Sequence, residues 1–187
     1  MITGDAFARQ AESDQYTGIP YSKLDCQGFV ERVLSDAGVR DSRGKAYNWK
    51  GSNSMWRNAL SWKGTIAECR KRFGRIPLGA WVFIVKSDGG EKLRGYNDNE
   101  GNASHVGIFC SDDALCVRDS TKTNRRDGVG YRVLDGFTHV GLCKYLDYNS
   151  GSTTTAEQAI HTIRNAGSTD ADYLAALQYL INYLGGN

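Results

Sequence analysis

The sequence predicts an α+β fold in which a helix packs on an antiparallel sheet of about five strands. Two observations support this: apolar residues recur at helical spacing after Cys26, and short apolar runs typical of strands follow from residue 80 onward. Residues that favour turns separate these runs, as in an antiparallel meander, and helices packed on such a sheet form a common architecture. The expected strands are 80–85, 105–110, 114–119, 130–134 and 139–146.

Two helices are expected before the sheet. Residues 4–15 carry a modest apolar stripe, and a glycine and a proline then interrupt the helical pattern. The second helix should start at or just before Cys26 and run for about three turns to Gly38, with Asp25 as a possible cap. The thiol of Cys26 is therefore expected in the first turn of a helix.

A cysteine in that position is suited to nucleophilic chemistry. The unpaired N–H groups and the positive end of the helix dipole favour a thiolate, and the same N–H groups can stabilise an oxyanion. Most cysteines outside CxxC motifs merely fill apolar space, so a base is also needed. His105 and His139, two of the three histidines, both stand at the start of strand-like runs. A Cys-His pair is therefore available.

Three short motifs occur in order along the chain. They are DCQGFV at 25–30, PLGAWVF at 77–83 and SHVGIF at 104–109, with Tyr21 upstream of the first. Their order and spacing resemble the NlpC family (NlpC/p60 superfamily) of cell-wall cysteine peptidases, whose usual strings are similar to DCSGFV, PGD before an apolar strand, and HVGIY. The resemblance covers residues 15 to about 146. It implies a papain-like fold and a thiol peptidase.

Residue by residue, the resemblance implies that Cys26 is the nucleophile and His105 the base. The third polar residue, often histidine in the family, is here Asp119, which can accept the ring N–H of the histidine and stabilise the imidazolium. Gln27 stands where the family usually has serine, and Ala80 where it usually has aspartate. These differences concern the substrate more than the cysteine chemistry. We assign substrate binding to Tyr21, Asp25, Gln27 and Ser104.

His105 and His139 head nearly identical strings, SHVG and THVG, so the local pattern alone does not choose the base. His105 is favoured because an aliphatic residue and an aromatic residue follow, as in the family, and because a hairpin over 105–119 could bring Asp119 to the same end. His139 should then be a strand-end residue whose ring is hydrogen-bonded to the backbone.

The expected reaction is acyl transfer through a thioester on Cys26, with His105 protonating the leaving amine. The resemblance implies an amide bond in peptidoglycan stem peptides as the substrate, often a γ-D-glutamyl to diamino-acid link. One alternative is an N-acetylmuramoyl-alanine amidase or another Cys-His acyl-transfer enzyme. Another is a catalytically degenerate wall-binding or structural protein. Asp25 could recognise a free amine of the substrate or simply cap its helix.

Composition excludes several classes of function. A formal charge of +2 over 187 residues does not suggest a nucleic-acid partner, and no stretch is apolar enough to span a membrane. The N-terminus lacks the features of a secretory signal, so we expect synthesis in the cytoplasm and action at the cell wall through phage lysis, a virion or specialised secretion. An endolysin of phage or bacterial origin fits this expectation.

Cysteine usage predicts neither a metal nor a cofactor. Five cysteines without CxxC spacing argue against a disulfide framework and against structural zinc, so reduced thiols are expected. A bridge between Cys110 and Cys116 across the hairpin remains open. Cys69 is expected on a short helix.

Two segments are harder to interpret. Residues 38–75 are rich in glycine, asparagine and serine and suggest short helices and loops, with Trp49, Trp56 and Trp62 either packed inside or lining a substrate groove. Residues 149–155 indicate a linker before two helices at 155–165 and 169–184. We therefore divide the chain into a peptidase domain, 1–148, and a linker with an accessory helical hairpin, 149–187, which could bind a partner protein.

Overall fold

The computed structural model describes residues 1–86, 96 and 98–148, which fall in one compact unit, Met1–Tyr148. The helices are α1 (Gly4–Ala11), α2 (Cys26–Asp36), α3 (Ser52–Asn58) and α4 (Ile66–Phe73), with a 3₁₀ helix at Asp14–Tyr16. The strands are β1 (Leu60–Thr65), β2 (Trp81–Lys86), β3 (Asn102–Phe109), β4 (Val117–Lys122), β5 (Asp127–Arg132) and β6 (His139–Cys143). The predicted hairpin and its linker lie outside the described residues, and the predicted domain boundary stays a prediction.

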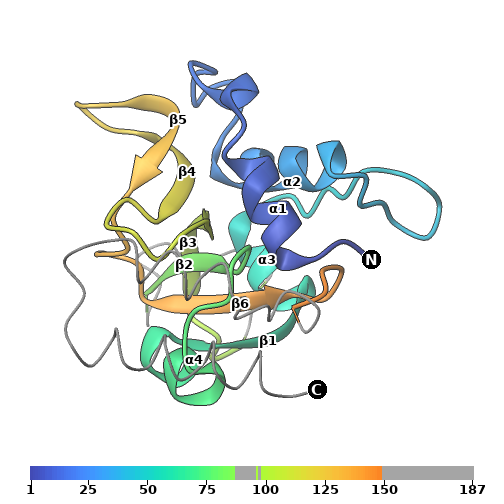
Figure 1. Ribbon diagram of the computed structural model, residues 1–187, viewed down its shortest axis with the longest axis vertical. Coiled ribbons are helices and arrows are strands. Elements are labelled where there is room, and N and C mark those ends of the chain that lie inside the picture. Colours follow the sequence, from blue (N-terminus) through green and yellow to red (C-terminus); the bar gives the residue numbers. More distant parts are fainter. Residues whose placement is uncertain (87–95, 97, 149–187) are drawn as a thin grey trace, which may run out of the picture. The chain divides into compact units, whose positions relative to one another are not determined.

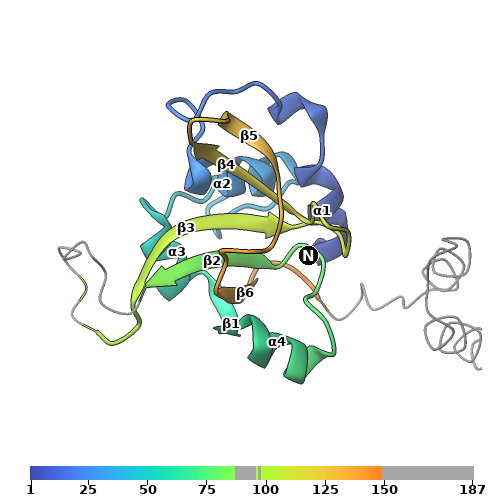
Figure 2. The same ribbon diagram turned by 90° about the vertical axis from the view of Figure 1, so that its left-hand side faces the viewer.

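The strands form one antiparallel sheet in the order β1-β6-β2-β3-β4-β5 (Figure 1). The α+β class is therefore confirmed, with six strands among the described residues where about five were expected. Helix α2 packs against β3 and β4, whereas α4 lies beside β1 at one edge of the sheet (Figure 2). The start of α2 thus faces the strands that carry His105 and Asp119.

Helix α2 begins at Cys26, as predicted. The Asp25 side chain accepts a hydrogen bond from the Gly28 N–H at 2.7 Å, which satisfies one of the free donors of the first turn. The apolar face of α2 is fully buried, and each such side chain contributes about 1.5–3 kcal/mol through burial. Its members are Phe29, Val30, Val33 and Leu34. The helix is therefore anchored in the core by its apolar face and fixed at its start by its cap.

Strand β1 was missed by the prediction of helices and loops over 38–75. Its sequence, LSWKGT, lacks an apolar run because β1 is an edge strand that pairs only with β6 and is mostly half-exposed. The short helices α3 and α4 are as expected, and Cys69 lies on α4. A capping box between Thr65 and Glu68 starts α4 and was readable in the sequence as TIAE.

Other boundaries shifted by a few residues. The first helix ends at Ala11 and not at residue 15, where the 3₁₀ turn takes over. Strand β4 runs from Val117 to Lys122, a few residues later than the predicted 114–119. Its end was not predicted because the buried residues there include polar ones, such as Asp119 and Ser120, which break the apolar pattern of a strand. Strand β5 begins at Asp127, three residues before the predicted start.

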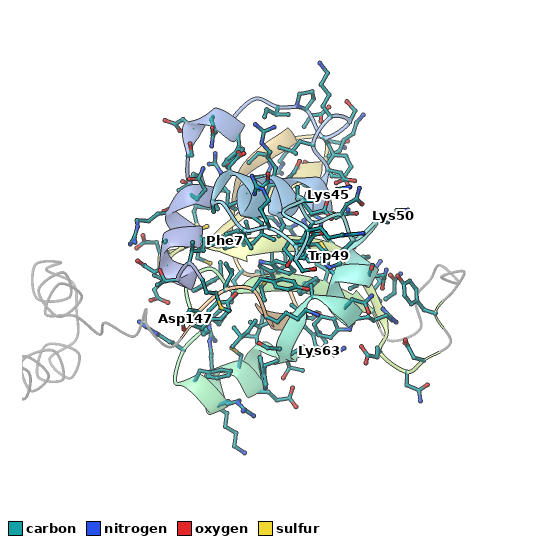
Figure 3. The ribbon with its side chains drawn as sticks, turned by 90° about the vertical axis from the view of Figure 1, so that its right-hand side faces the viewer. Phe7, Lys45, Trp49, Lys50, Lys63 and Asp147 are labelled. Atoms are coloured by element: carbon teal, nitrogen blue, oxygen red, sulfur yellow. The ribbon has the colours of Figure 1, made fainter. Side chains whose placement is uncertain are left out.

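Two tryptophans of the 38–75 segment, Trp49 and Trp56, contribute mainly to packing. Trp49 stacks on Tyr47, with ring centroids 4.8 Å apart, and meets Trp81 edge-on at 5.6 Å; Figure 3 marks its place along with that of Phe7, a fully buried side chain of α1. Trp56 is 5% exposed. For these two tryptophans the structure favours the packed insertion over the groove wall.

All five cysteines lie among the described residues, and all are buried free thiols. The Cys110 N–H donates to the Cys116 carbonyl at 2.7 Å, but the two sulfur atoms are not bonded. Within the described residues, no helix is both long and apolar enough to cross a membrane.

Candidate active site

The Cys26 thiol lies at the start of α2 and is almost covered, with the residue 6% exposed. The Tyr21 hydroxyl is directed at Sγ from 3.9 Å. Burial raises the pKa of Tyr21 to about 12, and the neighbouring Cys26 adds to the effect because it disfavours a second negative charge. Tyr21 is therefore a neutral hydroxyl donor beside the sulfur at physiological pH.

His105 and Asp119 are joined by a hydrogen bond of 2.7 Å between Nε2 and Oδ2. The β3–β4 pairing sets Ile108 opposite Arg118, and this register, continued by one residue, sets Asp119 opposite Gly107, two residues from His105 on the same face of β3. Gly107 makes room for this approach: a Cβ atom there would lie 3.1 Å from Cβ of Asp119. The predicted proximity of His105 and Asp119 is confirmed.

The electrostatics of this pair favour a charged histidine and an ionised aspartate. Burial lowers the pKa of His105, but hydrogen bonds to Asp119 and Cys26, with the charges of both partners, outweigh it and raise the pKa from 6.5 to about 9. Burial raises the pKa of Asp119, but His105 and Arg126 together bring it below its ordinary value. His105 thus interacts with the thiol on one side and the carboxylate on the other.

Two arginines complete the surroundings of the fully buried Asp119. Arg126 binds Oδ1 through Nη2, and Nη1 of Arg132 lies 3.4 Å from Oδ2. Neither arginine was predicted as a site residue. A buried carboxylate needs compensating donors, but it is the β4–β5 pairing that identifies them as Arg126, just before β5, and Arg132, the last residue of β5.

The β4–β5 hairpin also holds the loop that leads into α2. The Tyr21 N–H donates to Oδ1 of Asp127 at 2.8 Å, and the Ser120 hydroxyl donates to the Leu24 carbonyl. Gly128, with φ +109°, packs so closely that a Cβ atom would lie 2.1 Å from the Ile19 carbonyl oxygen. One hairpin therefore positions both Asp119 and the segment that carries Tyr21 and Cys26.

The other predicted substrate-binding residues have structural partners. Asp25 caps α2. Gln27 donates to Glu31 at 2.9 Å, and Glu31 also accepts the Trp49 N–H at 2.6 Å. Ser104 is exposed, and its hydroxyl donates to the Ile84 carbonyl at 3.3 Å. Of the four, Tyr21 is the one whose side chain the structure shows against the thiol; the substrate roles of all four stay predictions.

His139 occupies a different place in the sheet. It lies on β6, separated from β3 by β2, and its ring meets Trp56 edge-on at 5.4 Å. Its Nδ1 lies 2.8 Å from the Thr138 hydroxyl. The predicted hydrogen bond to the backbone was therefore wrong, because the partner of the ring is a side chain. Burial lowers the pKa of His139 and so favours the neutral ring.

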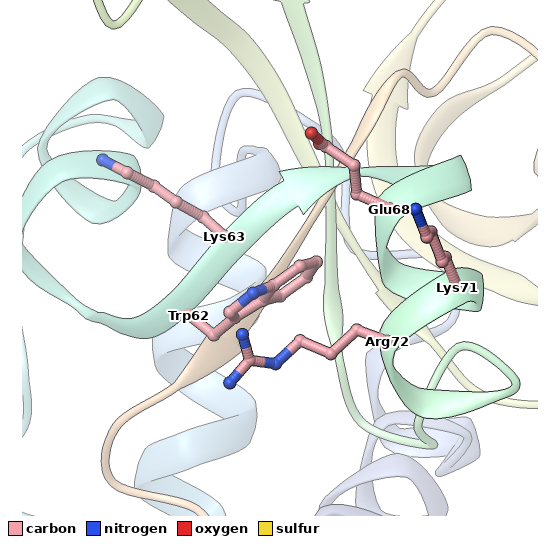
Figure 4. A pocket seen from close by; sticks show the side chains of 5 residues that line it. All are labelled: Trp62, Lys63, Glu68, Lys71 and Arg72. Atoms are coloured by element: carbon pink, nitrogen blue, oxygen red, sulfur yellow. The ribbon is translucent and has the colours of Figure 1, made fainter.

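A separate pocket of about 400 Å³ lies between β1 and α4 (Figure 4). It is lined by Trp62, Lys63, Glu68, Lys71 and Arg72, and it includes none of the candidate catalytic residues. Trp62 therefore lines a hollow at the β1 edge of the sheet, on the side away from β4. Nowhere in the described part of the chain is a group of three or more histidine, cysteine or acidic side chains arranged to hold a metal ion.

Comparisons with protein-family models, with curated proteins and with solved structures each found no match for this chain.

Proposed function

We propose that this chain is a cysteine hydrolase that cleaves amide bonds in peptidoglycan stem peptides, with a papain-like peptidase domain of the NlpC type. The observation that carries the proposal is the hydrogen bond of 2.7 Å between His105 and the buried Asp119, together with the electrostatic interaction of the same ring with the Cys26 thiol at the start of α2. A nucleophile, a base that interacts with it and an anion that orients the base are the parts that thiol acyl transfer requires.

The mechanism follows from the charges. With His105 protonated and Asp119 ionised, a Cys26 thiolate is stabilised by the imidazolium and by the start of α2. The thiolate attacks the amide carbon, and the oxyanion can accept hydrogen bonds from N–H groups of the first turn or from the Tyr21 hydroxyl. His105 then gives its proton to the leaving amine, and water, deprotonated by His105, hydrolyses the thioester.

The motifs, and not the geometry, suggest the substrate. A γ-D-glutamyl to diamino-acid bond is the first candidate, because the strings around Cys26 and His105 resemble those of endopeptidases that cut it. The muramoyl-alanine amidase and the non-catalytic wall binder remain alternatives. A pure binder would not need the buried charges around Asp119, since ionised groups in the interior are costly unless they are paired.

The test is mass spectrometry of purified muropeptides incubated with the protein. We expect a new free amine within the stem peptide in the wild type and no product with Cys26→Ala. A product with a free sugar end would assign the amidase. Unchanged muropeptides with a folded wild-type protein, or full turnover by Cys26→Ala, would contradict the proposal.

A further inference from the structure

Arg126 contacts the same carboxylate as His105 but through the other oxygen. His105 uses Oδ2 of Asp119, whereas Nη2 of Arg126 binds Oδ1. The Asp119 side chain is fully buried, and that of Arg126 is 23% exposed. The carboxylate thus bridges a histidine that takes part in the proposed chemistry and a guanidinium that does not touch the thiol side of the site.

The guanidinium is held in place by its own partners. Nη1 of Arg126 donates to the Tyr131 carbonyl at 3.0 Å, so the fork spans the β4–β5 hairpin. Gly130 leaves the space that the side chain fills, because a Cβ atom there would lie 2.5 Å from Nη1 and 2.8 Å from Cδ. An exposed surface ion pair contributes little to stability. The Arg126–Asp119 pair differs because its carboxylate is buried and its guanidinium is held in a fixed geometry.

The guanidinium of Arg126 changes how strongly the Asp119 carboxylate attracts the proton of His105. Among the described residues, the ionisable groups that act on the His105–Asp119 pair are Cys26 on α2, Arg126 at the hairpin turn and Arg132 on β5, whereas Tyr21 lies against the Cys26 sulfur. Alone, a buried carboxylate would hold a proton on the imidazole strongly. Shared with a guanidinium, it attracts that proton less, which matters when His105 must release it.

We propose that Arg126 is a positioning residue that fixes the Asp119 carboxylate and shares its negative charge, so that His105 can pass its proton to the leaving amine. This inference rests on the proposed function. A purely structural Arg126 would close the hairpin and stabilise the fold without changing the protonation of His105. The two roles are separable by following His105 directly.

The experiment is an NMR titration of the His105 ring in the full chain carrying Cys26→Ala, which gives a readout independent of turnover. Arg126→Gln should raise the pKa of His105 by about one unit, because a nearby cation is lost. Arg126→Lys, which keeps the charge, should restore most of the original value. The matched control is Arg125→Gln: Arg125 is the exposed neighbour and is not an ion-pair partner of Asp119, so the titration should not move.

In the active protein, Arg126→Gln should move the basic limb of the kcat/KM profile to higher pH and lower kcat about three- to tenfold at neutral pH. An unchanged His105 titration in folded Arg126→Gln would overturn the inference. If that variant does not fold, Gly130→Ala is used instead, because it displaces the guanidinium of Arg126 without removing it. An unchanged pKa of His105 in Gly130→Ala would then overturn the inference. Turnover by Cys26→Ala would instead refute the proposed function while leaving the titration result valid.

Discussion

At the scale of single residues, Asp119 is the group on which the candidate site depends most. It is fully buried, it orients His105, and its charge is balanced by His105, Arg126 and Arg132. Asp119 was predicted from the family resemblance and from its place in a hairpin, whereas the arginines were not, because contacts across a strand pair have no local signature in the sequence.

Asp119→Asn should reduce turnover by on the order of 10²–10⁴-fold while leaving some activity. The amide can still accept a hydrogen bond from the ring, but it cannot stabilise the imidazolium by charge. The assay is kcat on a purified muropeptide, with Asp135→Asn as the control because Asp135 is exposed. Equal kcat in both variants would remove Asp119 from the mechanism.

The raised pKa of His105 also predicts how stability depends on pH. Because the folded value of about 9 lies above the unfolded value of 6.5, this ring stabilises the folded state fully below about pH 6.5, and the contribution is lost as the pH rises through 9. Its size is on the order of 3 kcal/mol. Urea unfolding at pH 6 and pH 10 should show the decrease. An equal decrease in His105→Gln would show that another group causes it.

At the scale of elements, the strands buried on both faces were the most predictable and the edge was the least. Strand β2 was expected almost as found, since WVFIV is a continuous apolar run. Strand β1 was not, because an edge strand mixes apolar and polar residues and depends on its pairing with β6. The start of α2 was predictable because capping is a local interaction.

Gly107 links the β3–β4 pairing to the site. In Gly107→Ala the new Cβ would lie 2.7 Å from Cγ1 of Val117 and 3.1 Å from Cβ of Asp119, so strand β4 must shift. We expect a loss of about 1–3 kcal/mol in the free energy of unfolding from overpacking, together with a large loss of kcat.

The control for that variant is Val106→Ala, which leaves a cavity in the same strand without crowding Asp119. It should lower stability but keep most of kcat when both are measured at a temperature where each variant is folded. If both variants lose kcat in proportion to their stability, Gly107 has no special role in placing Asp119.

At the scale of the whole molecule, the residues of the candidate site all lie before Tyr148, on α2 and the loop before it, on β3, β4 and β5, and on the turn between β4 and β5. We therefore expect a chain ending at Tyr148 to keep its turnover of soluble muropeptides and to lose activity, if at all, only on intact walls. Kinetics of the shortened and full chains on both substrates would measure this. An insoluble shortened chain would mean that residues after 148 belong to the core, against the predicted boundary.

The central claim is that Cys26 and His105 act as one catalytic unit, and the most direct test is the turnover of a purified muropeptide by single and double variants. Cys26→Ala and His105→Ala should each abolish nearly all hydrolysis, and the double variant should be little worse than either, because residues of one relay are strongly non-additive. His139→Ala should keep most of the activity. If His139→Ala abolished hydrolysis while His105→Ala left it intact, the proposed base and the role of Asp119 would both be wrong.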